Sequence, residues 1–297
     1  GKRGDLIMEE NLTIGFIGIG VMGKSMATHL LNDNYKVHVY TRTKTKATKL
    51  LEKGAVWADS PKAIADKCNF IITMVGYPKD VEEVYFHDGI LDHAHAGTYC
   101  IDMTTSSPTL AKKIANAAKS KNLFALDAPV SGGDIGAKNG QLAIMVGGER
   151  EVFEKALPIL QLLGTNIKLQ GSAGAGQYTK MCNQIVIASN MMGVCEAIVY
   201  AKKVGLDPSS VLDSISTGAA GSWSLSNLAP RIIKGDYNPG FFVKHFIKDM
   251  KIALDSAAEM NLDLPGLTLA KTLYEQLAYN GGENYGTQAL IKVLEKE

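Results

Sequence analysis

The chain has 297 residues, a length that suits two domains or one large domain with an appendage. Hydrophobic residues make up 46% and charged residues 21%, with 31 Lys and Arg against 30 Asp and Glu. This composition excludes a disordered chain, and the balanced charge argues against a nucleic-acid partner. No run approaches the roughly 20 apolar residues that cross a bilayer, and the N-terminus lacks the apolar stretch of a secretory signal. We therefore expect a cytoplasmic protein with no membrane partner.

Cysteine and histidine usage indicates neither disulfides nor a metal site. The four cysteines are Cys68, Cys100, Cys182 and Cys195. They lack metal-ligand or Cys-x-x-Cys spacing and have apolar neighbours in sequence, so we expect reduced thiols in the core. His93 and His95 lie on a predicted loop without an acidic or thiol partner. No metal is therefore expected.

The first half of the chain alternates between strand and helix patterns. Short apolar runs predict strands at residues 13–16, 36–40, 70–75, 98–102, 124–127 and 142–147. Helical patterns lie between them, at residues 22–32, 44–53 and 61–67. Such alternation predicts an α/β fold with a parallel, doubly wound sheet.

The second half is predicted to be all-helical. After Gly171 the alternation ends, and a long helical pattern covers residues 177–204. Further helix starts are indicated at Asp207-Pro208 and near Asn238-Pro239, and residues 286–297 predict a last short helix. We expect an α/β domain at 12–171 and a helical domain at 172–297, joined by the long helix.

A glycine-rich turn, Gly18-Ile19-Gly20-Val21-Met22-Gly23, follows the first predicted strand and opens the first helix. In such a turn Gly18 makes the tight bend, Gly20 lets the backbone approach a pyrophosphate, and Gly23 allows close helix packing. The N–H groups at the start of the helix, around Val21 and Met22, favour phosphate binding. The pattern is weak alone, because glycines also occur in ordinary turns. Its position between strand and helix predicts a dinucleotide site.

The second predicted strand ends in Tyr40-Thr41-Arg42-Thr43. A carboxylate at this place binds the ribose 2′-hydroxyl of NAD. Here Arg42 instead offers a guanidinium suited to a 2′-phosphate, and Thr41 and Thr43 add hydroxyl donors. The residues therefore favour NADP(H) over NAD(H). The alternative is that Arg42 and Lys44 belong to a solvated loop.

Four blocks make the chain resemble the β-hydroxyacid dehydrogenase family, relatives of 3-hydroxyisobutyrate dehydrogenase and of glyoxylate and succinic semialdehyde reductases. The blocks are residues 15–23 (GFIGIGVMG), 127–133 (DAPVSGG) and 174–184 (GAGQYTKMCNQ), with Lys248-Asp249. The resemblance in their order and spacing covers about residues 12–290. The resemblance implies an N-terminal Rossmann domain that binds NADP, a helical substrate and dimerisation domain, and an active site in the cleft between them.

The resemblance assigns catalysis to Lys180. Hydride transfer to a carbonyl leaves an alkoxide, and an ammonium group both stabilises that charge and supplies the proton. Ser131-Gly132-Gly133 follows a predicted strand, and successive N–H groups with the Ser131 hydroxyl suit a substrate carboxylate. The alternative for these glycines is a tight turn that needs their flexibility.

Other site residues follow from the same resemblance. Asn183 is expected to be the catalytic amide that orients the substrate, with Gln184 as a neighbour that substitutes for it. On a helix both share a face with Lys180. Lys248 is expected to reach the cofactor from the second domain. The nicotinamide side is expected to be lined by Met74, Val75 and Thr105, although the hydroxyls near Thr105 equally suit a helix cap.

For the aromatic residues Trp223, Phe241 and Phe242 we expect packing in the core rather than a place in the substrate pocket.

The expected activity is NADP(H)-dependent interconversion of a short carboxylate-bearing aldehyde or 2-oxo acid and its hydroxy acid, in a homodimer or homotetramer. The alternatives are an imine reductase-like enzyme and a non-catalytic dinucleotide-binding scaffold. Lys180 argues against both, because by resemblance such proteins replace or lose the lysine.

Overall fold

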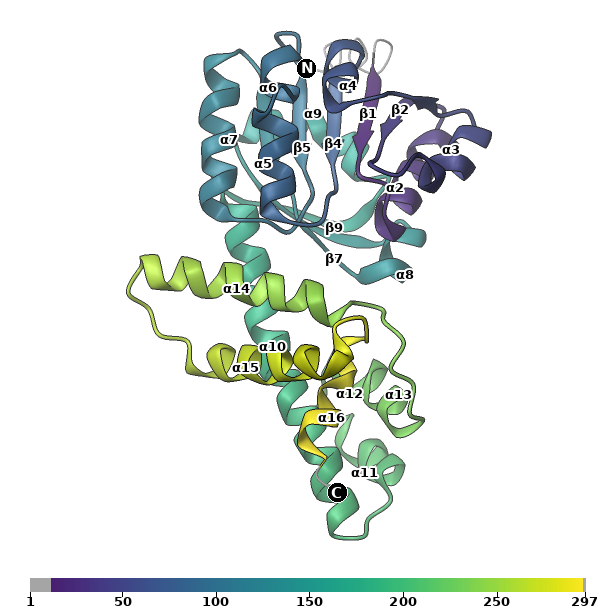
Figure 1. Cartoon of the computed structure of the whole chain (residues 1–297), viewed down its shortest axis with the longest axis vertical. Helices are drawn as coiled ribbons and strands as arrows, with labels where there is room; N and C mark the ends of the chain where they lie inside the picture. The colour runs from purple at the N-terminus through teal and green to yellow at the C-terminus, as the bar shows by residue number, and fades with distance from the viewer. Residues whose placement is uncertain (1–11, 296–297) are drawn as a thin grey trace. The chain divides into compact units, whose positions relative to one another are not determined.

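The computed structural model describes residues 12–295, so the N-terminal residues that bear on a secretory signal lie outside it. Contacts divide the chain into two compact units, one up to Lys180 and one from Met181 onwards (Figure 1). The first unit alternates strands and helices, and the second is helical. The predicted α/β domain followed by an all-helical domain is confirmed.

The first unit contains the following elements: β1 (Thr13–Ile17), α2 (Val21–Asn32), β2 (Lys36–Tyr40), the 3-10 turn η1 (Lys44–Ala47), α3 (Thr48–Glu52), β3 (Val56–Trp57), α4 (Pro61–Lys67), β4 (Phe70–Thr73), α5 (Pro78–Phe86), α6 (Ile90–His93), β5 (Tyr99–Asp102), α7 (Pro108–Ser120), β6 (Phe124–Asp127), β7 (Val130–Ser131), α8 (Gly133–Lys138), β8 (Leu142–Gly147), α9 (Arg150–Leu160) and β9 (Gly164–Gly171).

These strands form one sheet in the order β3-β2-β1-β4-β5-β6-β8-β7, with β9 paired to β8. Strands β1 to β6 run parallel to one another, as predicted. Strand β8 runs antiparallel to β6 and β7, and β9 runs parallel to β8. The parallel expectation is therefore wrong for β8. Only residues 132–141 separate β7 from β8, fewer than the dozen or so that a parallel crossover needs.

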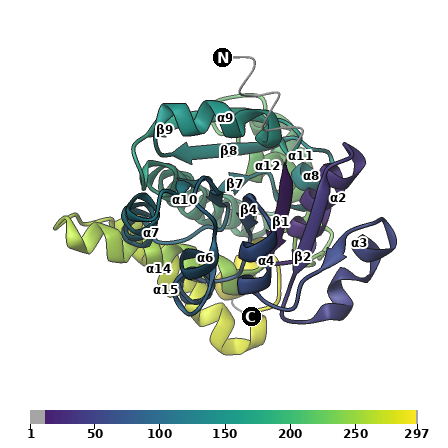
Figure 2. The same cartoon turned by 90° about the horizontal axis from the view of Figure 1, so that it is seen from above.

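Helices cover both faces of the sheet, as Figure 2 shows. Phe16 and Phe70 point to the face covered by α2, α8 and α9, where they join one apolar cluster. Ile17 and Ile71 point to the opposite face and pack with residues of α4, α5 and α7. Alternate strand residues thus serve opposite cores, which explains why the parallel strands read as continuous apolar runs.

The sequence patterns did not predict β3, β7 or β9. Strands β3 and β7 have two residues each, too few to show a period. Strand β9 is largely exposed, and only Ile167 and Leu169 mark its inner face. An edge strand with so few apolar residues resembles a polar loop in sequence.

The second unit is built from α-helices and short helical turns. Its elements are α10 (Ala175–Lys203, which begins in the first unit), α11 (Pro208–Ile215), α12 (Trp223–Asn227), α13 (Ala229–Ile233), α14 (Val243–Glu259), α15 (Pro265–Leu277), η2 (Ala278–Gly282), η3 (Thr287–Leu290) and α16 (Ile291–Leu294).

Among the described residues α10 is the one helix long and apolar enough, by length and composition, to cross a membrane. Its buried side chains, including Met191, Val194 and Ile198, belong to the core of the helical unit. The apolar face of α10 therefore serves that core.

Three expectations for the second unit are wrong. The helix expected near Asn238-Pro239 begins only at Val243, because the Asn238 carbonyl accepts hydrogen bonds from Arg231 and Gln288 and holds this segment outside the helix. Cys182 is exposed, because it lies on the face of α10 opposite its buried neighbours. Trp223 is 68% exposed at the first position of α12, whereas Phe241 packs against the core.

The start of α10 is fixed to the end of β6 by a buried carboxylate. Asp127 accepts hydrogen bonds from the N–H groups of Gly174 (2.8 Å) and Gln177 (2.9 Å). Burial raises the pKa of Asp127, and the N–H groups oppose that rise. A β-carbon on Gly176 would overlap the carbonyl oxygen of Met145, so the helix starts in direct contact with the sheet.

We predict that Gly176→Ala destabilises the protein by about 1–3 kcal/mol, since the added methyl group meets backbone atoms that have no room to move. Gly193→Ala on the same helix is the matched control. Within the described residues nothing lies within 4 Å of the added atom there, so it should stabilise by about 1 kcal/mol. Urea unfolding of both variants measures the difference, and equal effects would contradict the close contact.

Candidate functional site

The glycine turn between β1 and α2 has the geometry of a phosphate cradle. Gly18 has a φ of +100°, and a β-carbon there would overlap the Met74 carbonyl. A β-carbon on Gly23 would overlap the Gly18 carbonyl, which explains the third glycine. At Gly20, by contrast, no atom within residues 12–295 lies within 4 Å of the position a β-carbon would take.

This open space fits a bound pyrophosphate. No side chain among the described residues caps the start of α2, and its first turn contains no acidic residue. Val21 is 65% exposed at the first helical position. Unsatisfied N–H groups at a helix N-terminus attract an anion. The turn therefore fits a dinucleotide, with Gly18, Gly20, Val21, Met22 and Gly23 as the residues that would hold it.

Arg42 lies directly after β2, and carboxylates after β4 hold it. Its Nη2 donates to Asp80 Oδ1 at 2.8 Å and to Glu83 Oε2 at 3.2 Å. The hydrogen bond to Asp80 raises the pKa of Arg42. The Arg42 side chain is 66% exposed, whereas that of Asp80 is only 10% exposed and also accepts from the Tyr77 N–H. Asp80 thus fixes the direction of the guanidinium and offsets part of its charge.

The neighbours of Arg42 differ in their surroundings. Thr41 is partly buried, and Thr43 is exposed. The Lys44 ammonium lies over the Trp57 ring, 5.4 Å from its centroid. A cation in this place contacts the aromatic face, so Lys44 has an attractive interaction within the fold itself.

The loops that carry Met74, Val75 and Thr105 are cross-linked to each other. The Val75 N–H donates to Thr104 Oγ1 at 3.0 Å. Asp102, at the end of β5, accepts from the Thr73 hydroxyl at 2.8 Å and from the Thr104 N–H at 3.2 Å. Burial raises the pKa of Asp102 to about 6. This buried carboxyl group therefore ties the ends of β4 and β5 together beneath the predicted nicotinamide side.

Ser131 ends β7, and Gly132 and Gly133 lead into α8. Both glycines have a left-handed backbone, with φ of +130° and +62°. No side chain caps this helix start among the described residues, and the space around a β-carbon on Gly133 is open. The turn needs glycine at two successive positions, and it also leaves N–H groups for an anion. Both interpretations of the sequence are therefore compatible with this geometry.

Lys180 lies in the second turn of α10 and is buried. One turn earlier, Gln177 is fully buried and binds the loop after β5 twice. Its Oε1 accepts from the Ser106 N–H at 2.9 Å, and its Nε2 donates to the Thr104 carbonyl at 2.8 Å. The helix segment that carries Lys180 is therefore fixed to the loop that contains Thr105.

In the helical unit, Asn183 and Gln184 of α10 form a network with α14. Asn183 Nδ2 donates to Gln184 Oε1 at 2.7 Å, and Gln184 Nε2 donates to Asp249 Oδ2 at 2.7 Å. Lys248 Nζ lies 2.9 Å from Asp249 Oδ1. The structure thus brings these predicted residues of the second unit together around Asp249.

Positioning residues were largely missed by the sequence reasoning. Asp127 and Gln177 are within the motif blocks, but no role follows from their residue types alone. The roles of Asp80 and Asp102 depend on contacts with other strands. Ser107 does cap α7, because its Oγ accepts from the Leu110 N–H. The helix-cap alternative for the hydroxyls near Thr105 is therefore confirmed for Ser107.

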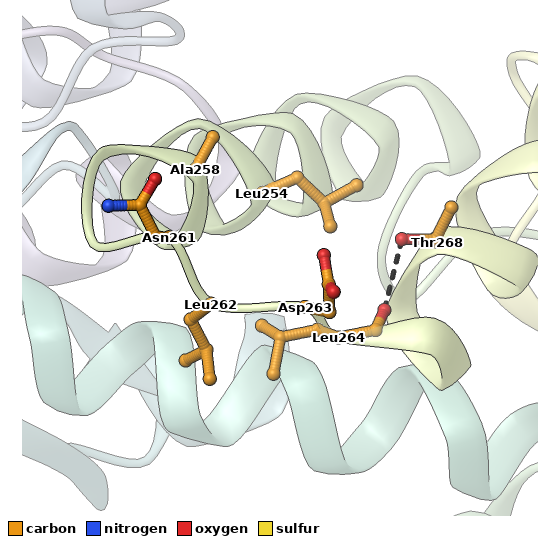
Figure 3. Close-up of a pocket in the computed structure, with 7 residues that line it drawn as sticks. All are labelled: Leu254, Ala258, Asn261, Leu262, Asp263, Leu264 and Thr268. Atoms are coloured by element: carbon orange, nitrogen blue, oxygen red, sulfur yellow. Dashed lines mark hydrogen bonds between the residues drawn. The ribbon is translucent and has the colours of Figure 1, made fainter.

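A pocket of about 400 Å³ lies where α14 turns into α15 (Figure 3). It is lined by Leu254, Ala258, Asn261, Leu262, Asp263, Leu264 and Thr268. The Thr268 hydroxyl donates to the Leu264 carbonyl at its edge. None of the predicted site residues lines this pocket, so it is separate from the candidate site.

Comparison with known proteins identifies the family of the chain. Residues 13–171 match the NAD binding domain of 6-phosphogluconate dehydrogenase, and residues 174–294 match the NAD-binding domain of NADP-dependent 3-hydroxyisobutyrate dehydrogenase. The chain belongs to the β-hydroxyacid dehydrogenase family. Members of this family are NAD(P)-dependent oxidoreductases, and the chain is therefore an NAD(P)-dependent hydroxyacid dehydrogenase.

Individual members of the family are similar over nearly the whole chain. A probable 3-hydroxyisobutyrate dehydrogenase-like protein of Arabidopsis thaliana is 47% identical, covering 98% of this chain and 88% of its own length. The 2-hydroxy-3-oxopropionate reductase of Escherichia coli is 39% identical, covering 96% and 97%. The solved structure of Mycobacterium tuberculosis 3-hydroxyisobutyrate dehydrogenase has a TM-score of 0.89 at 30% identity, covering 96% and 99%.

We predict that Gly20→Ala weakens NADPH binding at least about 10-fold and leaves stability within about 1 kcal/mol. The added methyl group meets no protein atom, but it occupies the space of the pyrophosphate. Fluorescence titration gives the dissociation constant, and urea unfolding without cofactor gives the stability. Unchanged affinity would contradict a cofactor at this turn.

Proposed function

We propose that this dehydrogenase uses NADPH to reduce a short aldehyde or 2-oxo acid that carries a carboxylate, with Lys180 as the general acid. The observation that carries the proposal is the fixed start of α10. Asp127 and Gln177 attach its first turn to the ends of β5 and β6, where ligands of doubly wound sheets bind. Lys180 follows Gln177 by three residues on this helix.

A bound dinucleotide supplies the hydride. The ammonium group of Lys180 donates a hydrogen bond to the substrate carbonyl oxygen, stabilises its developing negative charge and transfers a proton to it. Backbone N–H groups of Ser131, Gly132 and Gly133 hold the substrate carboxylate. In the oxidation direction Lys180 accepts the proton of the substrate hydroxyl.

The names of two relatives support a small acid as substrate. One relative is named for 3-hydroxyisobutyrate and another for 2-hydroxy-3-oxopropionate. Each compound is a short carboxylic acid with a hydroxyl group. A carboxylate site at Ser131 to Gly133 and an acid at Lys180 suit this class.

We predict that Lys180→Ala lowers kcat at least about 100-fold, the smaller end of what general acid catalysis contributes. The assay follows NADPH oxidation with glyoxylate, succinic semialdehyde, tartronate semialdehyde and methylmalonate semialdehyde. Lys203→Ala, an exposed lysine at the end of the same helix, is the control and should keep the parent rate. If no compound is turned over, or Lys180→Ala keeps full activity, the proposal is wrong.

The preference for NADPH depends on Arg42. No carboxylate is present at residues 41–47, directly after β2, and both hydrogen bonds from Arg42 to carboxylates use Nη2. Within residues 12–295 no hydrogen bond uses Nε or Nη1, so these groups remain for a 2′-phosphate. Each can donate separately to a phosphate oxygen, because both parallel donor pairs of a guanidinium include Nη2.

We predict that Arg42→Ala raises the KM for NADPH about 10- to 100-fold and changes that for NADH less than threefold, because only NADPH carries the 2′-phosphate. Lys46→Ala, an exposed lysine in η1, should change neither value. Michaelis constants of both cofactors measure the effect. A parent protein that prefers NADH would contradict the assignment.

A cytoplasmic location and a homodimer or homotetramer stay predictions. We also propose that Met74, Val75, Thr105 and Lys248 contact the cofactor and that Asn183 and Gln184 orient the substrate.

A further inference from the structure

Three side chains of the helical unit, those of Asn183, Gln184 and Asp249, form a relay of hydrogen bonds in which each donates to the next. It runs from Asn183 to Gln184 to Asp249, with both donor–acceptor distances at 2.7 Å. Gln184 is 2% exposed and Asp249 is 1% exposed, so water does not compete for these groups. These hydrogen bonds link Gln184 to Asp249, 65 positions away in sequence, and are therefore a feature of the fold.

The buried carboxylate sets the direction of this relay. A carboxylate accepts hydrogen bonds but cannot donate them, so Gln184 must turn its NH₂ group towards Asp249. The Gln184 carbonyl oxygen then faces Asn183 and accepts from the Asn183 NH₂ group. As a result the side-chain carbonyl oxygen of Asn183 takes no part in this series of hydrogen bonds. Within residues 12–295 it accepts no hydrogen bond.

Lys248 is the counter-ion of Asp249. Its ammonium lies 2.9 Å from Oδ1, an atom that accepts no hydrogen bond from any described residue. A buried carboxylate is costly unless a cation offsets its charge. The side chain of Lys248 is 11% exposed, so this ion pair is screened little by solvent.

We propose that Asp249 is a positioning residue that makes Asn183 a hydrogen-bond acceptor, and that the enzyme consequently selects substrates with a hydroxyl group beside the carboxylate. This inference rests on the proposed function, because it places Asn183 at the substrate. An acceptor oxygen attracts a hydroxyl donor and repels a carboxylate. Asn183 follows Lys180 by three residues, so both side chains lie on one face of α10.

The test compares two aldehydes that differ only in the hydroxyl group: tartronate semialdehyde, which carries it, and malonate semialdehyde, which lacks it. The readout is the ratio of their kcat/KM values with NADPH. A general loss of activity or of cofactor affinity affects both substrates and cancels in this ratio. We expect the parent enzyme to favour tartronate semialdehyde at least about 10-fold, because a site built for a hydroxyl rejects the analogue without it.

Asp249→Asn should reduce this preference to less than about threefold. An asparagine can donate as well as accept, so the two amides are free to reverse and to present the Asn183 NH₂ group instead. Gln184→Met interrupts the relay while leaving the Asp249–Lys248 pair, and it should have the same effect. If Asp249→Asn does not fold, Gln184→Met alone tests whether the hydrogen bonds from Asp249 to Asn183 set the substrate preference.

Non-additivity distinguishes positioning from a general structural role. Asn183→Leu removes the acceptor and should abolish the preference, and Asp249→Asn added to it should change the ratio no further. If Asp249→Asn keeps the parent's preference, or lowers it equally with and without Asn183, the inference is wrong. If the parent turns over both aldehydes without preference, this inference fails while the proposed function stands. If it turns over neither aldehyde nor any other carboxylate-bearing one, the proposed function fails.

Discussion

The carboxylate of Asp127 at the start of α10 is the interaction on which the candidate site depends. A helix of 29 residues begins there, and its first N–H groups need acceptors. Asp127 supplies both of its oxygens from the end of β6, and the positive end of the helix dipole favours its charge. Because β6 belongs to the sheet, the first turn of α10 is held at the ends of the strands. The position of Lys180 in the first unit follows from this attachment.

Asp102 and Asp249 are also buried carboxylates that accept hydrogen bonds from a neighbouring element, Asp102 in the sheet and Asp249 in the helical unit. Asp102 ties the loops after β4 and β5 together through Thr73 and Thr104. Asp249 sets the direction of two amides on α10. Each carboxylate is buried and accepts from groups on a neighbouring element, so the loss of solvation is offset by hydrogen bonds. Buried acceptors thus fix the geometry that the exposed glycine turns and Lys180 require.

The order of strands and helices could be predicted from the sequence because the parallel strands are apolar on both faces, and the glycine turn could be found because Gly18 and Gly23 have no room for a side chain. The antiparallel direction of β8 was not predicted, since an apolar run does not encode its own direction. The partner of Arg42 was also hidden, because Asp80 lies 38 residues away and meets it only when β2 and β4 take their places on either side of β1. The same holds for Asp249 and Gln184.

The motif from Gly174 to Gln184 combines residues that the fold requires with residues that chemistry requires. Gly174 has a φ of +94°, Gly176 has no room for a β-carbon, and Gln177 binds the loop after β5. A protein with this helix start needs these three residues whether or not it performs catalysis. The attachment of the helix start is made by Asp127 and Gln177. The rest of the motif is therefore evidence mainly for the attachment of the helix start, and the proposed proton transfer depends on Lys180 itself.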